Sequence, residues 1–175
     1  MLSVIVPCFN EEEVLDSLVR TLDEVLPQAV AASAAGRPQE DGRGFEVILV
    51  DDGSSDRTLE LMREVTASRP GFHYVSLSRN FGKESAMLAG LSHARGDHVA
   101  ILDADLQHPP SLLLQMMPLL DQGYDQVVAR RTRSGDPRFR TAVSRLYYHL
   151  FNRLIDVKLQ DGVGDFRVMT RAAVD

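Results

Sequence analysis

One acidic cluster in the sequence has the residue types and the spacing of a cation-binding site. Asp103 and Asp105 are one residue apart, and the amide of Gln107 follows two positions later. Oxygen ligands of this kind suit Mg²⁺ or Mn²⁺ if the turn leaves the extended conformation. His108 could add a ligand, although a histidine next to two prolines is more often a positioned turn residue. A D-x-D pattern is also common in turns that cap a helix, so spacing alone leaves both interpretations open.

A second group of polar and aromatic residues has the composition of a nucleoside site. The segments Pro7–Glu12 and Asp51–Ser54 each follow an apolar run. A carboxylate such as Asp52 can accept the imide N–H of uracil, and Phe9 can stack on a base. Taken alone, the second segment is better explained as a turn between a strand and a helix, with Asp56 as the helix cap.

Positive charge is concentrated in one part of an acidic chain. The net charge is −6, yet the window Arg130–Arg153 holds seven arginines and one acid, so the window is +6 and the remainder −12. Arg79–Lys83 adds cations and a glycine, although an exposed basic loop would look the same. The overall charge argues against general nucleic-acid binding. The basic window either meets anions or forms a solvated helix.

Apolar runs that alternate with amphipathic stretches predict the elements that position these residues. Strands are expected at 3–6, 45–50, 73–77, 97–102 and 124–129. Helices are expected at 11–26, 57–68, 83–94 and 109–121, with a surface insertion at 29–44. This order is typical of a mostly parallel sheet with helices on both faces. The acidic turns follow strands, where open α/β sheets place their ligands.

The bulk composition predicts one domain that does not cross a membrane, so that any membrane contact is peripheral. With 175 residues, 44% of them hydrophobic, the chain can bury one substantial core, and we expect a single domain over 1–175. Cys8, the single cysteine, is expected to be a small buried residue. The amino terminus lacks the features of a secretory signal, and no stretch approaches the roughly 18 apolar residues of a membrane-spanning helix.

Four motifs in a fixed order resemble the inverting glycosyltransferases of family two. They are VPCFNEE at 6–12, VDDGSSD at 50–56, NFGK at 80–83 and DADLQHPP at 103–110. The DLQHPP extension and the VGDFR segment at 163–167 are typical of the polyprenyl-phosphate branch, which includes dolichol-phosphate mannose synthases and bactoprenol glucosyltransferases. The resemblance covers essentially the whole chain and implies the GT-A fold, a Rossmann-like α/β sheet that is open, mixed and mostly parallel. Because such enzymes continue into membrane helices, we expect 1–175 to be truncated ahead of them.

The resemblance also implies roles for individual residues. The predicted nucleotide site consists of Pro7, Phe9, Glu11, Asp52, Lys83 and Ala104. The predicted ligands of Mg²⁺ or Mn²⁺ are Asp103, Asp105 and Gln107. Many relatives carry Tyr at position 9, and Phe9 keeps the stacking surface without the hydroxyl.

The acceptor side is implied by the same resemblance. The predicted ligands of an acceptor phosphate are Arg131, Arg140 and Ser144, of which the last two are four residues apart and share a helix face. Asp165 and Arg167 are expected beside the metal or the acceptor, with Asp165 as a base that the reaction does not require. An apolar stripe over 139–155 with arginines beside it has the composition of a helix on anionic lipid, or of a helix packed on the core.

The implied function is transfer of a hexose from a nucleotide-sugar donor to a polyprenyl-phosphate acceptor at the cytosolic membrane face. The donor would be UDP-glucose-like or GDP-mannose-like. An alternative is a glycosyltransferase whose acceptor is a sugar hydroxyl. A receiver-like signalling domain would leave the Asp103 motif and the arginine-rich segment unexplained, and nucleotidyltransferases or nicotinamide dehydrogenases would need a glycine-rich loop that is missing. The sequence leaves the sugar, the nucleotide and a homo-oligomer open.

Overall fold

The computed structural model describes residues 1–33, 44–130 and 163–175, in which strands and helices alternate along most of the chain. The strands are β1 (Leu2–Cys8), β2 (Phe45–Asp51), β3 (Phe72–Ser76), β4 (His98–Ile101), β5 (Gln126–Arg130) and β6 (Val163–Thr170). The helices are α1 (Leu15–Ala31), α2 (Thr58–Ser68), α3 (Lys83–His93), the 3-10 turn η1 (Pro110–Leu112), α4 (Leu113–Asp121) and α6 (Arg171–Val174).

The strands form one sheet in the order β3-β2-β1-β4-β6-β5. β1 is parallel to β2 and β4, and β2 is parallel to β3, whereas β6 is antiparallel to β4. The five predicted strands are present, with ends shifted by at most two residues. β6 is an additional strand that we did not predict. The expected open, mixed, mostly parallel sheet is confirmed.

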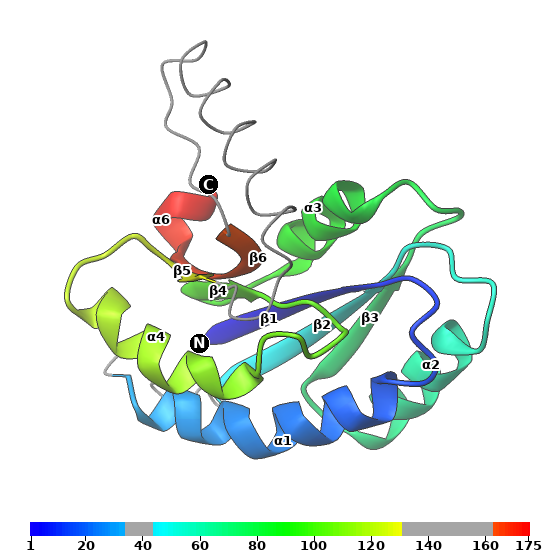
Figure 1. Cartoon of the computed structure of the whole chain (residues 1–175), viewed down its shortest axis with the longest axis horizontal. Helices are drawn as coiled ribbons and strands as arrows, with labels where there is room; N and C mark the ends of the chain where they lie inside the picture. The colour runs from blue at the N-terminus through cyan, green and yellow to red at the C-terminus, as the bar shows by residue number, and fades with distance from the viewer. Residues whose placement is uncertain (34–43, 131–162) are drawn as a thin grey trace, which may run out of the picture. The chain divides into compact units, whose positions relative to one another are not determined.

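Helices cover both faces of this sheet, as the sequence predicts. α1, α2 and α4 lie on one face, and α3 lies on the other (Figure 1). All seven positions of β1 and of β2 are buried, which is the pattern of strands covered on both sides. α3 lies close to β1 at Gly90, where a Cβ would meet Ile5 Cγ2 at 2.3 Å. This close packing brings the first residues of α3 to the carboxyl edge of the sheet.

α1 differs from its predicted range at both ends. It begins four residues later than expected and continues past Pro27 to Ala31, with Ala29 and Val30 buried. The predicted insertion at 29–44 is therefore wrong for its first residues, because burial of the apolar face outweighs the one helical hydrogen bond that Pro27 cannot donate. The remainder of that insertion, 34–43, lies outside the described residues.

The chain divides into two compact units, Met1–Val128 with Asp165–Asp175, and Ala129–Gly164. The first unit contains the core and the site described below. Most of the second unit lies outside the described residues, and so do the predicted helix at 139–155 and the predicted acceptor residues Arg131, Arg140 and Ser144. The single-domain organisation therefore stays a prediction.

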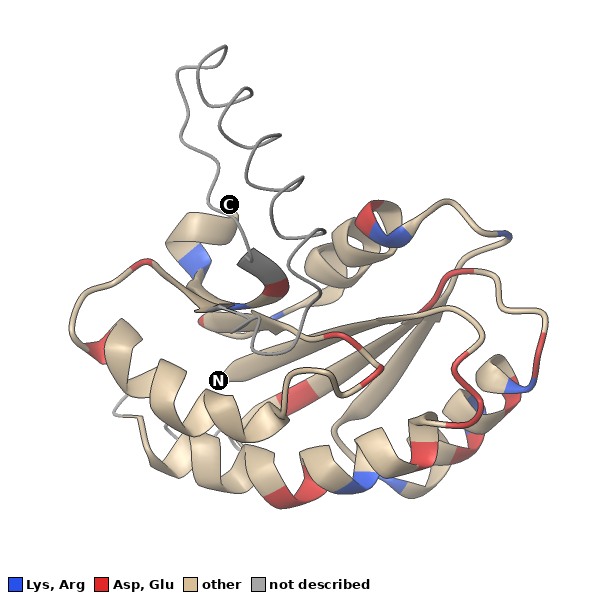
Figure 2. Cartoon of the chain, viewed as in Figure 1, with Lys and Arg blue, Asp and Glu red and all other residues tan. Residues whose placement is uncertain are grey.

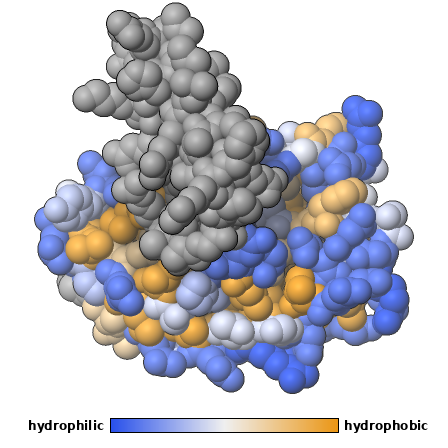
Figure 3. Space-filling model, in the orientation of Figure 1, coloured by the Kyte–Doolittle hydropathy of each residue, from blue (hydrophilic) through white to orange (hydrophobic). Residues whose placement is uncertain are grey.

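On the face seen in Figure 3, hydrophobic patches lie among hydrophilic residues of the described part of the chain. The large apolar side chains that are exposed are Phe9, Tyr74, Phe81, Leu88 and Tyr124. Scattered residues of this kind are normal on soluble domains. Within the described ranges, no helix has both the length and the apolar character that crossing a bilayer requires.

Candidate active site

The loops that follow the parallel strands open on one edge of the sheet, and acidic residues gather in the loops after β1, β2 and β4 (Figure 2). A cavity of about 320 Å³ lies among these loops. It is lined by Pro7, Cys8, Phe9, Glu11, Asp52, Asn80, Gly82, Lys83, Ala86, Asp103, Ala104 and Asp105. The structure thus brings together all six residues of the predicted nucleotide site and the two predicted metal carboxylates.

The loop after β1 is tied to the loop after β2. Asn10 has a φ of 56°, and its side-chain oxygen accepts a hydrogen bond from the backbone N–H of Ser55 at 2.8 Å. The backbone N–H of Glu11 donates to Thr58 Oγ1 at 2.8 Å. These bonds hold residues 10 and 11 outside α1, which begins at Leu15. They also keep Phe9, which is 44% exposed, at the rim of the cavity.

Asp52 fixes the loop that precedes α3. Its carboxylate is 3% exposed and accepts backbone N–H bonds from Phe81 at 2.8 Å and from Gly82 at 2.9 Å. Gly82 has a φ of 96°, a conformation that favours glycine. Sequence reasoning missed this anchoring role. Contact between Asp52 and a nucleobase stays a prediction, and each carboxylate oxygen retains a second lone pair for it.

The turn that carries Asp103 and Asp105 leaves the extended conformation at Leu106, where φ is 56°. Leu106 and Asn10 are the two non-glycine residues with positive φ in the described part of the chain, and both lie in loops of the site. Strained backbone of this kind concentrates at functional sites. Asp105 is exposed and accepts the backbone N–H of Gln107 at 3.0 Å. Gln107 is exposed and does not line the cavity.

An ammonium joins the D-x-D turn to β6. Lys83 Nζ donates to Asp103 Oδ1 and, at 2.6 Å, to Asp165 Oδ2, while Arg167 Nη2 lies 3.2 Å from Asp165 Oδ1. The hydrogen bond from Lys83 is the main cause that lowers the pKa of Asp165 below its ordinary value. Burial acts to lower the pKa of Lys83, but its hydrogen bonds to Asp103 and Asp165 raise it overall. Lys83 is therefore charged at neutral pH.

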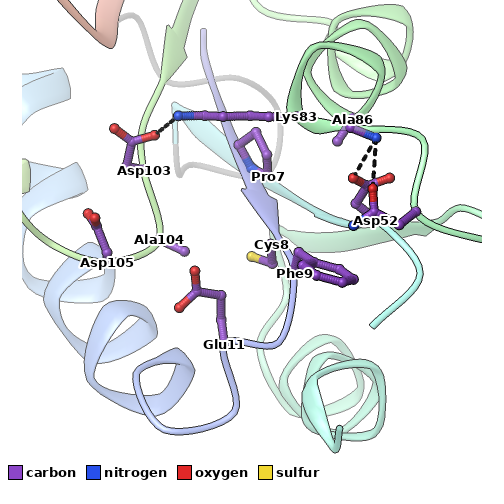
Figure 4. Close-up of a pocket in the computed structure, with 12 residues that line it drawn as sticks. Pro7, Cys8, Phe9, Glu11, Asp52, Lys83, Ala86, Asp103, Ala104 and Asp105 are labelled. Carbon is purple, nitrogen blue, oxygen red and sulfur yellow. Dashed lines mark hydrogen bonds and ion pairs between the residues drawn. The ribbon is translucent and has the colours of Figure 1, made fainter. Parts of the chain in front are cut away.

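Two further carboxylates at the cavity lack such compensation. Glu11 and Asp105 have no ion pair to any of the described residues. Burial, followed by the negative charges of Asp105, Asp56 and Asp103, raises the pKa of Glu11. Figure 4 shows the carboxylates of Glu11, Asp103 and Asp105 around the same space. The site therefore favours a cation.

The carboxylates fit a hard divalent cation only in part. Among the described residues, no group of three or more acidic, histidine or cysteine side chains is arranged to hold a metal ion. Mg²⁺, however, usually binds through one or two protein carboxylates together with substrate phosphates and water. Asp103 and Asp105 match that donor set if a diphosphate supplies the other ligands. The rings of His108 and Phe166 meet edge-on with their centroids 6.0 Å apart, and neither nitrogen of His108 has a hydrogen-bond partner among the residues that the structure describes.

Four cavity residues were not predicted as part of the site. Asn80 and Gly82 lie inside the NFGK motif, so the motif itself was a usable signal. Ala86 follows Lys83 by three residues on α3, and helical periodicity places both on neighbouring parts of one face. Cys8 is 2% exposed, as expected of a buried residue, and burial raises the pKa of its thiol. The thiol is therefore protonated and unreactive.

Comparison with known proteins connects this site to one family. The family described as "Glycosyl transferase family 2" matches residues 3–175. An undecaprenyl-phosphate 4-deoxy-4-formamido-L-arabinose transferase from Edwardsiella ictaluri is 40% identical over 97% of this chain and 48% of its own length. A bactoprenol glucosyl transferase of Shigella phage SfV is 35% identical over 99% of this chain and 53% of its own length.

A solved structure gives the same picture of the fold. Glucosyl-3-phosphoglycerate synthase from Mycobacterium tuberculosis, in complex with phosphoglyceric acid, aligns with a TM-score of 0.64 and 26% identity. The alignment covers 98% of this chain and 57% of that chain. The chain spans about half the length of the two curated relatives.

Proposed function

Because the chain belongs to glycosyl transferase family 2, we propose that it transfers a hexose from a nucleotide-diphosphate sugar to a polyprenyl phosphate. The observation that carries this proposal is that one cavity collects the predicted nucleotide site together with Asp103 and Asp105. The names of two relatives that match nearly the whole chain, one an undecaprenyl-phosphate transferase and one a bactoprenol glucosyl transferase, support the acceptor class.

The donor would lie with its base at the rim of the cavity and its diphosphate at the acidic turn. Phe9 offers an exposed ring for stacking, and Asp52 a charged acceptor. Asp103 and Asp105 would hold Mg²⁺ or Mn²⁺, with Gln107 as the third ligand that the resemblance implies. When bound, the metal stabilises the negative charge of the departing diphosphate. Lys83 lines the same cavity and presents a second positive charge to that diphosphate.

The proposed reaction needs no proton acceptor. An oxygen of the acceptor phosphate forms a bond to the anomeric carbon, the bond from that carbon to the diphosphate oxygen breaks, and the nucleoside diphosphate leaves with inversion. The phosphate is already anionic near neutral pH. Asp165 is held by Lys83 and Arg167, and its lowered pKa makes it a weak base. This arrangement favours a phosphate acceptor over a sugar hydroxyl, which would require deprotonation.

The acceptor site is proposed from the sequence, since its residues lie outside the described part of the chain. Arg131, Arg140 and Ser144 would bind the acceptor phosphate. The segment 139–155, with its apolar stripe and neighbouring arginines, would lie on anionic lipid at the cytosolic face of the membrane. The donor and the acceptor would then be bound by residues of different loops.

The experiment is a screen of UDP- and GDP-sugars, with undecaprenyl phosphate as acceptor and a free sugar hydroxyl as the competing acceptor. Transfer to the lipid phosphate is expected, and Arg140→Ala should abolish it while nucleotide affinity stays within about twofold, because the two sites use different residues. Arg20→Ala, which removes an exposed arginine of α1, is the matched control. Preference for the free sugar, or normal transfer by Arg140→Ala, would contradict the proposal.

A further inference from the structure

Two carboxylates, Asp103 and Asp165, lie two residues beyond the last registered pair of β4 and β6. Ile101 of β4 pairs with Arg167 of β6 in an antiparallel arrangement. If this register continues by two residues, Asp103 lies opposite Asp165. Like charges directly opposite each other destabilise neighbouring strands. A cation that binds both carboxylates removes this repulsion.

Lys83 supplies that cation from a third element. Its Nζ hydrogen-bonds to Asp103 and, at 2.6 Å, to Asp165. The backbone just before Lys83 is fixed, because Gly82 donates to the buried carboxylate of Asp52. The side chain is 40% exposed and lines the cavity. A fixed backbone with a long flexible side chain lets the ammonium reach more than one anion without any change in α3.

The same ammonium competes with the proposed metal. Lys83 binds an oxygen of Asp103, which is one of the two carboxylates available to a divalent cation at this turn. A divalent cation bound to Asp103 would place two positive charges next to the ammonium of Lys83. Like charges that share one carboxylate repel each other. The ammonium would have to leave Asp103. Asp165 would remain as its one carboxylate partner, and a diphosphate is an anion that can replace Asp103 as the second partner.

Resting on the proposed function, we propose that Lys83 is a positioning residue that makes metal binding depend on the donor. Before the donor binds, Lys83 hydrogen-bonds to both Asp103 and Asp165, and Arg167 supplies the second positive charge beside Asp165. With metal and nucleoside diphosphate bound together, the ammonium of Lys83 would contact the diphosphate in place of Asp103, and Asp103 would be free to hold the metal. Arg167, at 3.2 Å, keeps Asp165 neutralised after the exchange. Metal and nucleotide therefore bind cooperatively, and Lys83 carries part of the coupling.

Calorimetric titrations of the whole chain test this exchange without any turnover. Mn²⁺ alone, UDP alone and UDP with saturating Mn²⁺ are titrated into the wild type, Lys83→Met and Lys83→Arg. Lys83→Met should bind Mn²⁺ alone about tenfold more tightly than the wild type, and the factor by which UDP raises Mn²⁺ affinity should fall by a similar amount. Lys83→Arg keeps the charge and should stay within about threefold of the wild type in both measurements.

A purely structural role for Lys83 predicts a different outcome. In that case Lys83→Met would bind Mn²⁺ alone no more tightly than the wild type, and this result, in a protein with a native circular dichroism spectrum, would overturn the proposal. Lys83→Gln is measured in parallel with the same expectation, so the test does not depend on one variant folding. The electron paramagnetic resonance signal of free Mn²⁺ gives an independent count of bound ions.

Failure of the exchange can be told apart from failure of the proposed function. Cooperative binding of Mn²⁺ and UDP that weakens in Lys83→Met, without sugar transfer to polyprenyl phosphate, would contradict the acceptor and support the exchange. Normal transfer by the wild type, with Mn²⁺ affinity unchanged in Lys83→Met, would contradict the exchange alone.

Discussion

At the amino ends of the parallel strands, buried polar groups are satisfied by their own chain. Glu46, which is 6% exposed, accepts hydrogen bonds from Ser3 Oγ at 2.6 Å and from the backbone N–H of Arg95 at 2.8 Å. Ser3 Oγ in turn accepts the backbone N–H of Gly96 at 2.7 Å. The guanidinium of Arg171 donates to the carbonyl of Gly96. A Cβ at Gly96 would lie 2.6 Å from a backbone oxygen, so this edge is also filled.

At the carboxyl ends, the carboxylates of the described residues outnumber the cations that pair with them. One ammonium, that of Lys83, is shared by Asp103 and Asp165. Among the described residues, Glu11 and Asp105 have no ion pair, and the cavity of about 320 Å³ lies between them and the neighbouring loops. Asp105 is exposed, whereas Glu11 is partly buried, and charges removed from water are normally paired. We therefore propose that a ligand completes the carboxyl edge, whereas the amino edge serves stability.

Among the variants that distinguish the carboxyl edge from the amino edge, Asp105→Asn should have the largest effect on UDP binding and sugar transfer. Loss of this carboxylate should remove the Mn²⁺-dependent part of UDP binding and lower sugar transfer by at least about 100-fold, because it weakens stabilisation of the leaving group. Calorimetry and a transfer assay measure the two quantities. The free energy of unfolding should stay the same or rise, since an unpaired charge is removed.

The matched control is Asp97→Asn, the same change at the amino edge. Asp97 is 79% exposed and pairs with the amino-terminal ammonium at 2.7 Å. Loss of this pair should cost less than about 1 kcal/mol and leave nucleotide affinity unchanged. If Asp105→Asn and Asp97→Asn showed equal Mn²⁺-dependent binding of UDP, the proposed difference between the two edges would be wrong.

Two adjacent aspartates sharpen the comparison further. Asp52→Ala should weaken nucleotide binding by about 1 to 3 kcal/mol, because a charged acceptor at the cavity and the anchor of the Gly82 backbone are both lost. Asp51→Ala is the control, because Asp51 is 1% exposed and accepts bonds from Ser54 and Ser76 without lining the cavity. Asp51→Ala should lower the free energy of unfolding and leave nucleotide affinity unchanged. Similar nucleotide affinities of the two variants, measured by calorimetry, would refute the assignment.

Glu46→Ala tests the amino edge directly. The backbone N–H of Arg95 and the hydroxyl of Ser3 lose a buried acceptor, so the free energy of unfolding should fall by about 1 to 2 kcal/mol. Nucleotide affinity of the folded protein should not change. Urea unfolding and calorimetry check both expectations, with the exposed Glu24→Ala as the control. A loss of nucleotide affinity without a loss of stability would contradict the structural role of this edge.

The smallest expected effect is a gain of stability in Glu11→Gln. Because burial raises the pKa of Glu11 in the folded state, its ionised form opposes folding above the ordinary carboxyl pKa of about 4.3. The variant should gain less than about 1 kcal/mol at pH 7, since solvent screens this half-exposed group. The gain should disappear as the pH falls below 4.3, where both states of the wild type are protonated. A gain that does not change with pH would refute the electrostatic cause.

Local pattern was enough to predict most of the sheet and the loops of the site. The buried strands β1 and β2 are continuous apolar runs, and the acidic and aromatic motifs follow strands directly. Because parallel strands end on one edge, Phe9, Asp52 and Asp103 could be expected to line one site.

Long-range pairing was the part that the sequence did not reveal. In β6, Gly164, Asp165 and Arg167 interrupt the apolar pattern, so no strand was predicted there. Its antiparallel place beside β4 is what brings Asp165 to Lys83. The anchoring of Gly82 by Asp52 likewise joins backbone and side chain across separate loops. Neither contact follows from spacing along the chain.

The most direct test of the central claim is a calorimetric titration of UDP and of GDP into the chain, once with Mn²⁺ and once with EDTA. We claim that a divalent cation on Asp103 and Asp105 and a nucleoside diphosphate complete one site together. At least one nucleotide should therefore bind at least about tenfold more tightly with Mn²⁺ than with EDTA. Equal affinities of both nucleotides under the two conditions would contradict the claim.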